Sequence, residues 1–258
     1  MATEAKSEHV LELDSVVAGY GAMTILNGTA FKVRRAAITT IIGPNGAGKS
    51  TVFKTVFGLL KARTGKIVFN GADVTNFAPR KLIEAGICYV PQGRNIFPEL
   101  TVRHNLELGA VAAKAGINIA ERIEAAMERF PVLRRKANNQ ASTLSGGEQK
   151  LLEIARGLLL DPSLVLIDEP SIGLSPLMIR ETFDILMGLR ARGVSVLMVE
   201  QNAKSALEIS DDGIVLELGR MRMHEPARQL LNDPAVGQLF LGGASAAVSA
   251  PQSPAGAP

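Results

Sequence analysis

The chain has 258 residues, of which 47% are hydrophobic and 21% charged, enough for one large α/β domain, or two small ones, with a sizeable core. Its 28 basic and 25 acidic side chains nearly balance, and no basic run exceeds Arg134-Arg135-Lys136, which excludes a dedicated nucleic-acid-binding protein. The sequence contains no window of about 18 strongly apolar residues, the length needed to cross a membrane. The single cysteine, Cys88, cannot form an internal disulfide. Because no signal peptide is apparent either, we expect a cytoplasmic protein.

The first quarter of the chain carries strand and turn patterns. Residues 1–9 are mainly polar and are expected to form a frayed N-terminal arm. Alternating apolar residues from 10 to 33 predict short antiparallel strands, with turns at Gly19, Gly21, Asn27 and Gly28. The β-branched run ITTII at 38–42 is typical of a strand buried on both faces. A helix is expected from 49 to 60, and Gly65 is expected to close this unit.

The same unit, an apolar strand followed by a helix, recurs later in the chain. LVLI at 164–167 precedes a helix expected at about 176–190, and VSVLMV at 194–199 precedes one from about residue 203. Helical patterns dominate from about 93 to 157, most clearly at 120–129 and 148–160. We therefore expect an α/β fold with a mainly parallel sheet, an N-terminal antiparallel β subdomain and a helical insertion. The uncharged, proline-containing segment 242–258 is expected to be a disordered tail.

The segment GPNGAGKS at 43–50 has the phosphate-loop pattern, directly after a buried strand and at the start of a helix. Its glycines let successive backbone N–H groups converge at the positive end of a helix, where phosphate binds. Lys49 can reach the β- and γ-phosphates, and the Ser50 hydroxyl can ligate Mg²⁺. A glycine-rich connector is the alternative interpretation, and the flanking strand and helix disfavour it.

The segment LVLIDEP at 164–170 ends a buried strand in two carboxylates. In parallel sheets, ligands bind at that end of the strands. Asp168 would hold the Mg²⁺ shell, while Glu169 would orient or deprotonate the water that attacks the γ-phosphate. Alone, the motif is equally compatible with carboxylates that cap a helix. The phosphate loop favours the catalytic interpretation.

The segment LSGGEQ at 144–149 again offers a hydroxyl and glycine backbone at the start of a helix. It predicts either a second anion site or a simple helix cap. With GPNGAGKST before it and LVLIDEP after it, this order and spacing resembles the nucleotide-binding subunit of an ABC transporter, a P-loop NTPase. The resemblance covers about residues 10–240 and implies one nucleotide-binding domain at 10–241.

The resemblance also implies a set of nucleotide contacts. In that family two such domains pack head to tail, and ATP lies between the phosphate loop of one and the LSGGEQ-type motif of the other. Tyr20 would stack on adenine, unless it is only a hairpin tyrosine, and Gln92 would join the Mg²⁺ and water shell, so that the metal ligands would be Ser50, Gln92 and Asp168. The implied ATP contacts within one chain are Tyr20, Gly43, Pro44, Asn45, Gly46, Ala47, Gly48, Lys49, Ser50, Thr51 and Gln92. The implied contacts to ATP held by the partner are Ser145, Gly146, Gly147 and Glu148.

Two positions depart from the general family pattern. Ser175 stands where most members carry an aspartate that touches the other subunit, and Gln201 stands where a histidine usually senses the γ-phosphate. Glutamine can donate a neutral hydrogen bond but cannot supply a cation or shuttle a proton. The resemblance thus implies Glu169 and Gln201 as the catalytic residues, with a changed role at the second.

Several segments narrow the resemblance, among them EPSIGLSP and VEQNAKSALEISDDGIVLELG. They resemble the smaller ATP-binding subunit of the branched-chain amino acid uptake system. This implies an ATPase on the inner face of the cell membrane that energises import of branched-chain or related amino acids. The implied partners are a second ATPase subunit (a heterodimer is favoured over a homodimer), two membrane permease subunits and, indirectly, an extracytoplasmic solute-binding protein.

Other interpretations stay open. Urea and short-amide importers have similar ATPase subunits, and a soluble regulatory ABC ATPase would need no permease. A P-loop kinase would have no use for LSGGEQ. Ile96 and Phe97 are expected in an exposed loop, where they either contact a partner or pack under the helical insertion. Cys88 is expected to be inert in an apolar strand.

Overall fold

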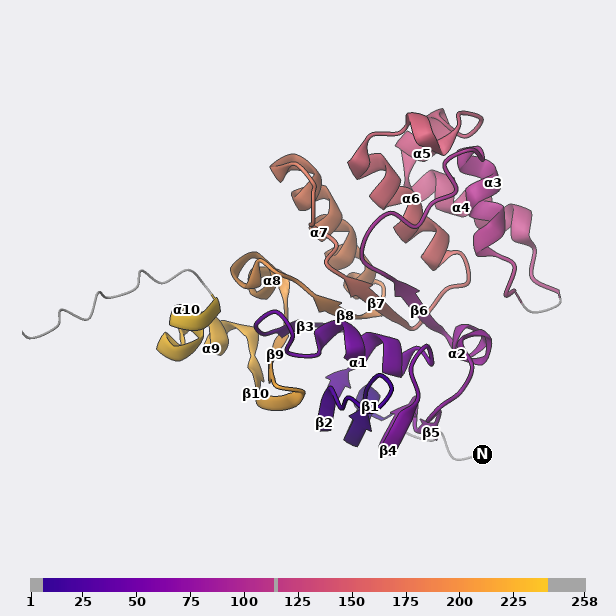
Figure 1. The fold of residues 1–258 in the computed structure, drawn as a ribbon. Helices are drawn as coiled ribbons and strands as arrows, with labels where there is room; N and C mark the ends of the chain where they lie inside the picture. The colour runs from indigo at the N-terminus through magenta and orange to yellow at the C-terminus, as the bar shows by residue number, and fades with distance from the viewer. Residues whose placement is uncertain (1–6, 114–115, 241–258) are drawn as a thin grey trace, which may run out of the picture.

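The computed structural model describes residues 7–113 and 116–240 (Figure 1). The tail expected at 242–258 lies outside these ranges, as do the first six residues of the expected N-terminal arm. His9, the last residue of that arm, already belongs to the first strand. Across the described part of the chain, no helix has the length and apolar character needed to cross a membrane.

A four-stranded antiparallel sheet forms the expected N-terminal β subdomain, with strand order β2-β1-β4-β5. Its strands are β1 (His9–Ala18), β2 (Leu26–Arg34), β4 (Ala62–Phe69) and β5 (Ala72–Asp73). The expectation of strands between residues 10 and 33 is therefore confirmed, whereas β4 was not predicted.

Three residues expected in turns lie inside strands instead. Asn27 and Gly28 belong to β2, and Gly65 belongs to β4. The pairing register of β1 shifts opposite both glycines, which have φ of 76° and 88°. Gly28 is the extra, left-handed residue of a β-bulge in β2, whereas opposite Gly65 the extra residue lies in β1, where Ser15 and Val16 face this one glycine. Such a bulge bends a strand without ending it.

A six-stranded sheet forms the centre of the molecule, with strand order β10-β9-β3-β8-β7-β6. All pairs are parallel except β9 with β10. The strands are β3 (Ile38–Ile42), β6 (Ile87–Val90), β7 (Leu164–Asp168), β8 (Ser195–Val199), β9 (Asp212–Glu217) and β10 (Arg220–Pro226). The mainly parallel sheet predicted from the sequence is thus confirmed.

The helices are arranged around this sheet. Figure 1 shows α1 between the two sheets, with α3 to α6 gathered in a separate helical part above β6 and β7. The helices are α1 (Lys49–Val56), α2 (Pro79–Ala85), α3 (Val102–Gly109), α4 (Ile119–Arg129), α5 (Pro131–Arg135), α6 (Gly146–Leu158), α7 (Pro176–Ala191), α8 (Ala203–Ile209), α9 (Ala227–Asn232) and α10 (Pro234–Phe240), with a 3-10 turn at Ala141–Thr143.

Helix α1 ends four residues earlier than the predicted Leu60. The chain turns at Gly58, where φ is 72° and a Cβ would lie 2.1 Å from the Phe77 carbonyl oxygen. Only glycine fits this close approach with a left-handed backbone, so the helix cannot continue.

The buried residues of β7 alternate between two cores. Leu164 and Leu166 pack in the cluster that surrounds α1, whereas Val165 and Ile167 pack in the cluster under the helical part. Since successive strand residues point to opposite faces, this short strand joins both cores and its last residue, Asp168, is held firmly at the sheet edge.

Candidate nucleotide site

The residues predicted to bind nucleotide or to act in catalysis lie close together because they follow parallel strands of one sheet. Asp168 pairs with Val199 at the end of β8, and Val199 also pairs with Ile41 near the end of β3. The carboxyl ends of these strands therefore meet at one edge. The phosphate loop, Asp168, Glu169, Gln92 and Gln201 all lie in or directly after strands that end there.

The phosphate loop leads into α1 without a side-chain cap. Gly48 is the N-cap residue, with φ of 103°, and no side chain caps the first turn. Gly43 approaches the neighbouring hairpin so closely that a Cβ would lie 2.1 Å from the Leu216 carbonyl oxygen. Pro44, Asn45 and Gly46 are exposed, so the loop presents its backbone to solvent at a helix N-terminus. This is the geometry that binds phosphate.

Lys49 is folded over its own loop. Its Nζ donates hydrogen bonds to the carbonyl oxygens of Gly43, at 2.8 Å, and Pro44, at 3.1 Å. Burial lowers the pKa of Lys49, while the charges of Glu169 and Asp168 oppose that shift. The ammonium group thus lies at the mouth of the loop, between it and the two carboxylates.

Asp168 is almost fully buried, with 2% of its surface exposed. Its Oδ1 has no hydrogen-bond partner among the described residues. Burial raises the pKa of Asp168, and interactions with the Ser50 and Tyr89 hydroxyls and with the charge of Lys49 oppose that shift. An unpaired buried carboxylate oxygen near a serine hydroxyl suits a hard cation such as Mg²⁺.

The described residues do not offer a complete metal cage. The described residues contain no cluster of three or more His, Cys, Asp or Glu side chains able to hold an ion. Mg²⁺ commonly binds through one or two carboxylates together with substrate phosphates and water. Ser50 and Asp168 therefore fit a cation that arrives with a nucleotide.

Glu169 is held by a hydrogen bond from Gln92. The Gln92 Nε2 donates to Glu169 Oε2 at 2.7 Å, and the Glu169 backbone N–H donates to the Val199 carbonyl oxygen at 2.9 Å. Burial raises the pKa of Glu169, the charge of Asp168 raises it further, and Lys49 and Gln92 oppose both. Glu169 also has φ of 48°, an unusual backbone conformation for a side chain of this size. The carboxylate is thus turned towards the edge of the sheet and fixed there.

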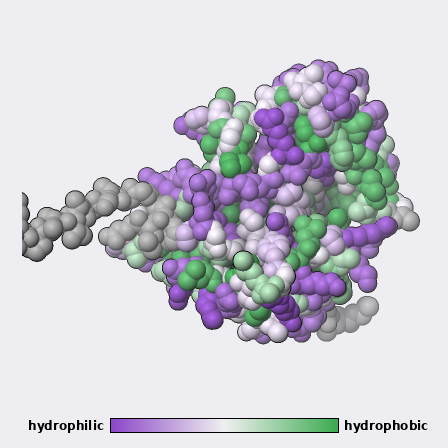
Figure 2. All heavy atoms as spheres, viewed as in Figure 1, coloured by the Kyte–Doolittle hydropathy of each residue, from purple (hydrophilic) through white to green (hydrophobic). Residues whose placement is uncertain are grey.

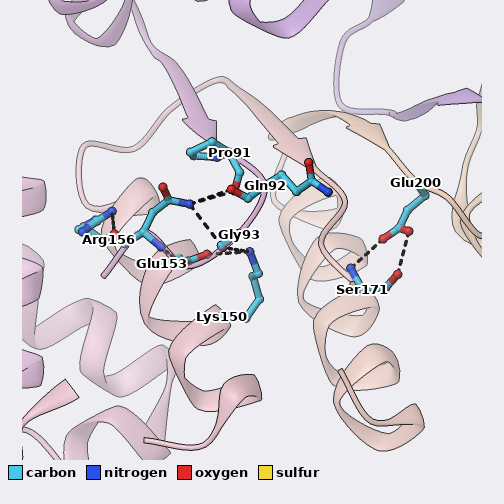
Figure 3. Close-up of polar contacts among 9 residues, drawn as sticks. Pro91, Gln92, Gly93, Lys150, Glu153, Arg156, Ser171 and Glu200 are labelled. Atoms are coloured by element: carbon cyan, nitrogen blue, oxygen red, sulfur yellow. Dashed lines mark hydrogen bonds and ion pairs between the residues drawn. The ribbon is translucent and has the colours of Figure 1, made fainter. Parts of the chain in front are cut away.

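Glu200 is a site residue that the motifs did not reveal. It is 2% exposed and accepts hydrogen bonds from Ser171 N at 2.8 Å and Ser171 Oγ at 2.7 Å (Figure 3). It also accepts a hydrogen bond from Gln201 N at 3.2 Å. Its carboxylate therefore joins the loop after Glu169 to the position of Gln201. The Gln201 side chain is exposed, so only its backbone is fixed. The one feature of the sequence that could have pointed to Glu200 is that this acid directly precedes Gln201.

Tyr20 lies in the connection between β1 and β2 and is 47% exposed. The Lys54 Nζ of α1 lies 5.8 Å from the centre of its ring. Arg63 fixes this connection through hydrogen bonds to the carbonyl oxygens of Gly21 and Met23. An exposed aromatic ring on a fixed loop near α1 is available for stacking.

The LSGGEQ motif forms the start of α6. Ser145 is the N-cap residue, and with Glu148 it makes a capping box, while Glu148 also pairs with Lys136 at 2.7 Å. Gly147 packs under α7, where a Cβ would lie 2.3 Å from the Met178 Cε. Ser175 similarly caps α7. Helix capping, which the sequence left open as an alternative, is therefore what Ser145 and Glu148 do within one chain.

The start of α6 belongs to the helical part, whereas α1 lies beside the sheets (Figure 1). The site residues thus form two groups: one comprises the phosphate loop, Gln92, Asp168 and Glu169, and the other comprises Ser145 to Glu148. No hydrogen bond or ion pair of the described residues joins the second group to the first.

Comparisons with known proteins agree with this geometry. A family model described as ABC transporter matches residues 26–172. The chain is 39% identical, over 234 residues, to the high-affinity branched-chain amino acid transport ATP-binding protein BraG of Pseudomonas aeruginosa, covering 91% of this chain and 100% of that protein. It is 37% identical, over 226 residues, to LivF of Archaeoglobus fulgidus, a probable branched-chain amino acid transport ATP-binding protein, covering 87% and 95%.

A solved structure is also similar. It is the dimeric post-hydrolysis state of an ATP-binding cassette bound to ADP and Pi, with 25% sequence identity and a TM-score of 0.74, covering 84% of this chain and 99% of that one.

Proposed function

This chain belongs to the ABC transporter family as an ATP-binding, ATP-hydrolysing subunit, and we propose that it powers the import of branched-chain or related amino acids through a separate membrane permease. The observation that carries the choice of substrate is the match over the whole length of a relative named for branched-chain amino acid transport. The site described above supports the energy source, since the phosphate loop, Gln92, Asp168 and Glu169 lie at one sheet edge.

In the proposed reaction the phosphate loop and Lys49 bind the β- and γ-phosphates of ATP, and Tyr20 stacks on adenine. Ser50, Gln92 and Asp168 would hold Mg²⁺, which would neutralise phosphate charge. Glu169 orients the attacking water and accepts its proton, which its raised pKa favours. Gln92 holds the Glu169 carboxylate in place. Gln201 donates a neutral hydrogen bond to the γ-phosphate, so charge stabilisation there rests on Lys49.

A second ATPase subunit completes the proposed site. Ser145, Gly146, Gly147 and Glu148 bind ATP held by the partner, for which the separation of the two groups in one chain is the structural support. The Ser145 oxygen accepts a hydrogen bond from Glu148 N, which leaves its O–H free to donate to a phosphate. We favour a heterodimer, with a homodimer as the alternative, because Gln201 gives this subunit a different γ-phosphate contact from a histidine-bearing partner.

The permease is proposed to dock between the sheet core and the helical part. A cavity of about 170 Å³ lies there, lined by residues of β6, the following loop, α3 and α6. Phe97 is 49% exposed beside it, whereas Ile96 packs against the helical core, so only Phe97 is available to a partner. Figure 2 shows hydrophobic surface over α3 and the start of α4, where Leu108, Val111 and Ile119 are exposed. Such a surface supports a peripheral position on the inner face of the cell membrane.

Cys88 forms part of the same cavity wall. It is buried, and burial raises the pKa of its thiol to about 12. Both observations support the expectation of an inert cysteine.

Co-purification tests the choice among transporters and soluble ATPases. A tagged chain extracted in mild detergent is expected to bring two hydrophobic permease subunits and a second ATPase. Recovery of only soluble partners would favour the regulatory ATPase instead. Binding assays with the associated solute-binding protein then separate the substrates, because branched-chain amino acids are expected to bind whereas urea and short amides are not.

A further inference from the structure

The loop after β6 carries Gln92, and it contacts the core of the helical part through a buried set of charges. The Asn95 side chain closes the loop by donating from Nδ2 to the carbonyl oxygens of Pro91, Gln92 and Gly93 at 3.2 to 3.4 Å. The Asn95 backbone N–H donates to Glu153 Oε1 of α6 at 2.5 Å. The loop is therefore folded as one unit, and α6 holds it at Asn95.

Three charged side chains of α6 face this loop. Lys150 Nζ donates to Glu153 Oε2 at 2.7 Å and to the Gly93 carbonyl oxygen at 3.5 Å (Figure 3). Arg156 donates to the Asn95 carbonyl oxygen and lies over the Phe97 ring. Glu153 is 3% exposed and Lys150 is 5% exposed. Both oxygens of Glu153 are thus used, one by the loop and one by Lys150.

A buried ion pair is a poor source of stability, because desolvation offsets the attraction between its charges. Apolar side chains at these two positions would pack as well. They could not accept the Asn95 N–H or donate to the Gly93 carbonyl. The charges of the Lys150–Glu153 pair are therefore explained by the loop contacts they make.

We propose that Glu153 is a positioning residue for ATP hydrolysis: with Lys150 it fixes the loop at residues 91–95, so that the Gln92 amide stays on Glu169. The inference rests on the proposed role of Gln92 and extends it to α6. Ser145 caps the start of α6, and Glu153 lies further along the same helix. One rigid helix thus joins two places: the surface proposed to meet the partner's ATP, and the loop that holds Glu169. Glu153 itself touches no reacting group.

The test compares steady-state ATP hydrolysis of the complex that co-purifies with the full-length chain, carrying either the wild-type chain or its variants Glu153→Ala, Glu153→Gln, Gln92→Ala and the double variant Gln92→Ala/Glu153→Ala. Glu153→Ala is expected to lower kcat about tenfold, with KM for ATP changed less than about twofold, because a charge-assisted hydrogen bond is lost. Glu153→Gln keeps an oxygen for the Asn95 N–H and is expected to retain more activity. In the Gln92→Ala background, Glu153→Ala is expected to change kcat less than about twofold, since coupled residues are not additive.

Two further variants separate positioning from folding. Met127→Ala removes a buried side chain of the same helical core without touching the loop, and is expected to lower the melting temperature while kcat stays within about twofold. Lys150→Met/Glu153→Leu replaces the pair with apolar side chains, and is expected to keep the melting temperature but to lower kcat as Glu153→Ala does.

The outcomes distinguish the inference from its premise. Unchanged kcat in Gln92→Ala would remove the proposed role of Gln92, and the inference with it. A loss in Gln92→Ala without one in Glu153→Ala or in the apolar pair would overturn the inference alone. Equal losses from Glu153→Ala in both backgrounds would also overturn it, because Glu153 would then act by another route.

Discussion

Asp168 and Glu169 are adjacent carboxylates with different surroundings. Asp168 is almost fully buried and has one oxygen without a partner, whereas Glu169 is half-buried and held by Gln92. Burial raises the pKa of both. The two carboxylates therefore suit different roles. The unpaired oxygen of Asp168 suits a cation, and the less buried Glu169 can reach water.

Glu169→Gln is expected to lower kcat about 100-fold or more, because an amide cannot accept the proton of the attacking water. ATP binding should persist, since the phosphate loop and Lys49 are unchanged. Steady-state hydrolysis together with equilibrium binding of a fluorescent ATP analogue checks both. Turnover near the wild-type rate would remove Glu169 from its proposed role.

The pH dependence of kcat should report the raised pKa of Glu169. Because the ionised form is the base, kcat rises as pH increases through that pKa, and the acid limb is expected above the ordinary pKa of a glutamate. Gln92→Ala removes a hydrogen bond that favours the ionised form, so its limb is expected at higher pH.

Gln201→Ala is the matched control, since it removes the same kind of amide from a side chain that makes no hydrogen bond to Glu169 in the described part of the chain; it should lower kcat without moving the limb. Rate profiles from about pH 5 to about pH 9 measure this. A limb that stays in place or moves to lower pH in Gln92→Ala contradicts the assignment.

At the scale of elements, the turn between β9 and β10 connects both sheets to the phosphate loop. Gly219 N donates to the Ala47 carbonyl oxygen at 2.9 Å, and the Gly219 carbonyl oxygen accepts from Asn27 N at 2.9 Å and from Thr29 Oγ1 at 2.6 Å. The phosphate loop is therefore supported from below by a hairpin that is remote in sequence.

Gly219→Ala is expected to lower the free energy of unfolding by about 2–4 kcal/mol. The φ of Gly219 is 71°, and a Cβ would lie 1.7 Å from the Ile25 carbonyl oxygen. The β9–β10 hairpin would therefore have to move away from Ile25. Gly71→Ala is the matched control, because its φ of 81° carries the same backbone cost and nothing lies within 4 Å of the added atom. Urea unfolding of both variants measures the difference, and equal losses would contradict the supporting role of the hairpin.

Elements with a strong local pattern could be predicted from the sequence, and elements defined by distant pairing could not. The apolar runs of β3 and β7 and the helix after β7 were found nearly to the residue, as was the start of the helix after β3, whose end was placed four residues too late. Strand β4 was missed because its glycine reads as a turn, and β10 because RMRMHEP alternates charged residues with methionine.

The same holds for the site. Motifs placed Lys49, Asp168 and Glu169, whereas Glu153 and Glu200 gain their roles from partners 58 and 29 residues away. No spacing rule connects such pairs.

At the scale of the whole molecule, the described residues form an ATPase core and a helical part, with Gln92 in the loop that connects them. The exposed Phe97 and the cavity beside it lie next to that loop, and α6 reaches from there to the surface proposed to meet the partner subunit. A permease bound at the first place and ATP bound at the second would therefore both act on the position of Glu169. In the proposed function, this arrangement would be the physical basis for coupling hydrolysis to transport.

The central claim is that ATP hydrolysis by this chain drives amino acid import, and reconstitution tests it most directly. The complex recovered with this chain is placed in vesicles with its solute-binding protein, and ATP hydrolysis is measured with and without leucine. Leucine is expected to stimulate hydrolysis severalfold and to accumulate inside the vesicles, and Glu169→Gln should abolish both effects. The account would be contradicted if the complex bound leucine but hydrolysed ATP at the same rate with and without it, and if no leucine accumulated inside the vesicles.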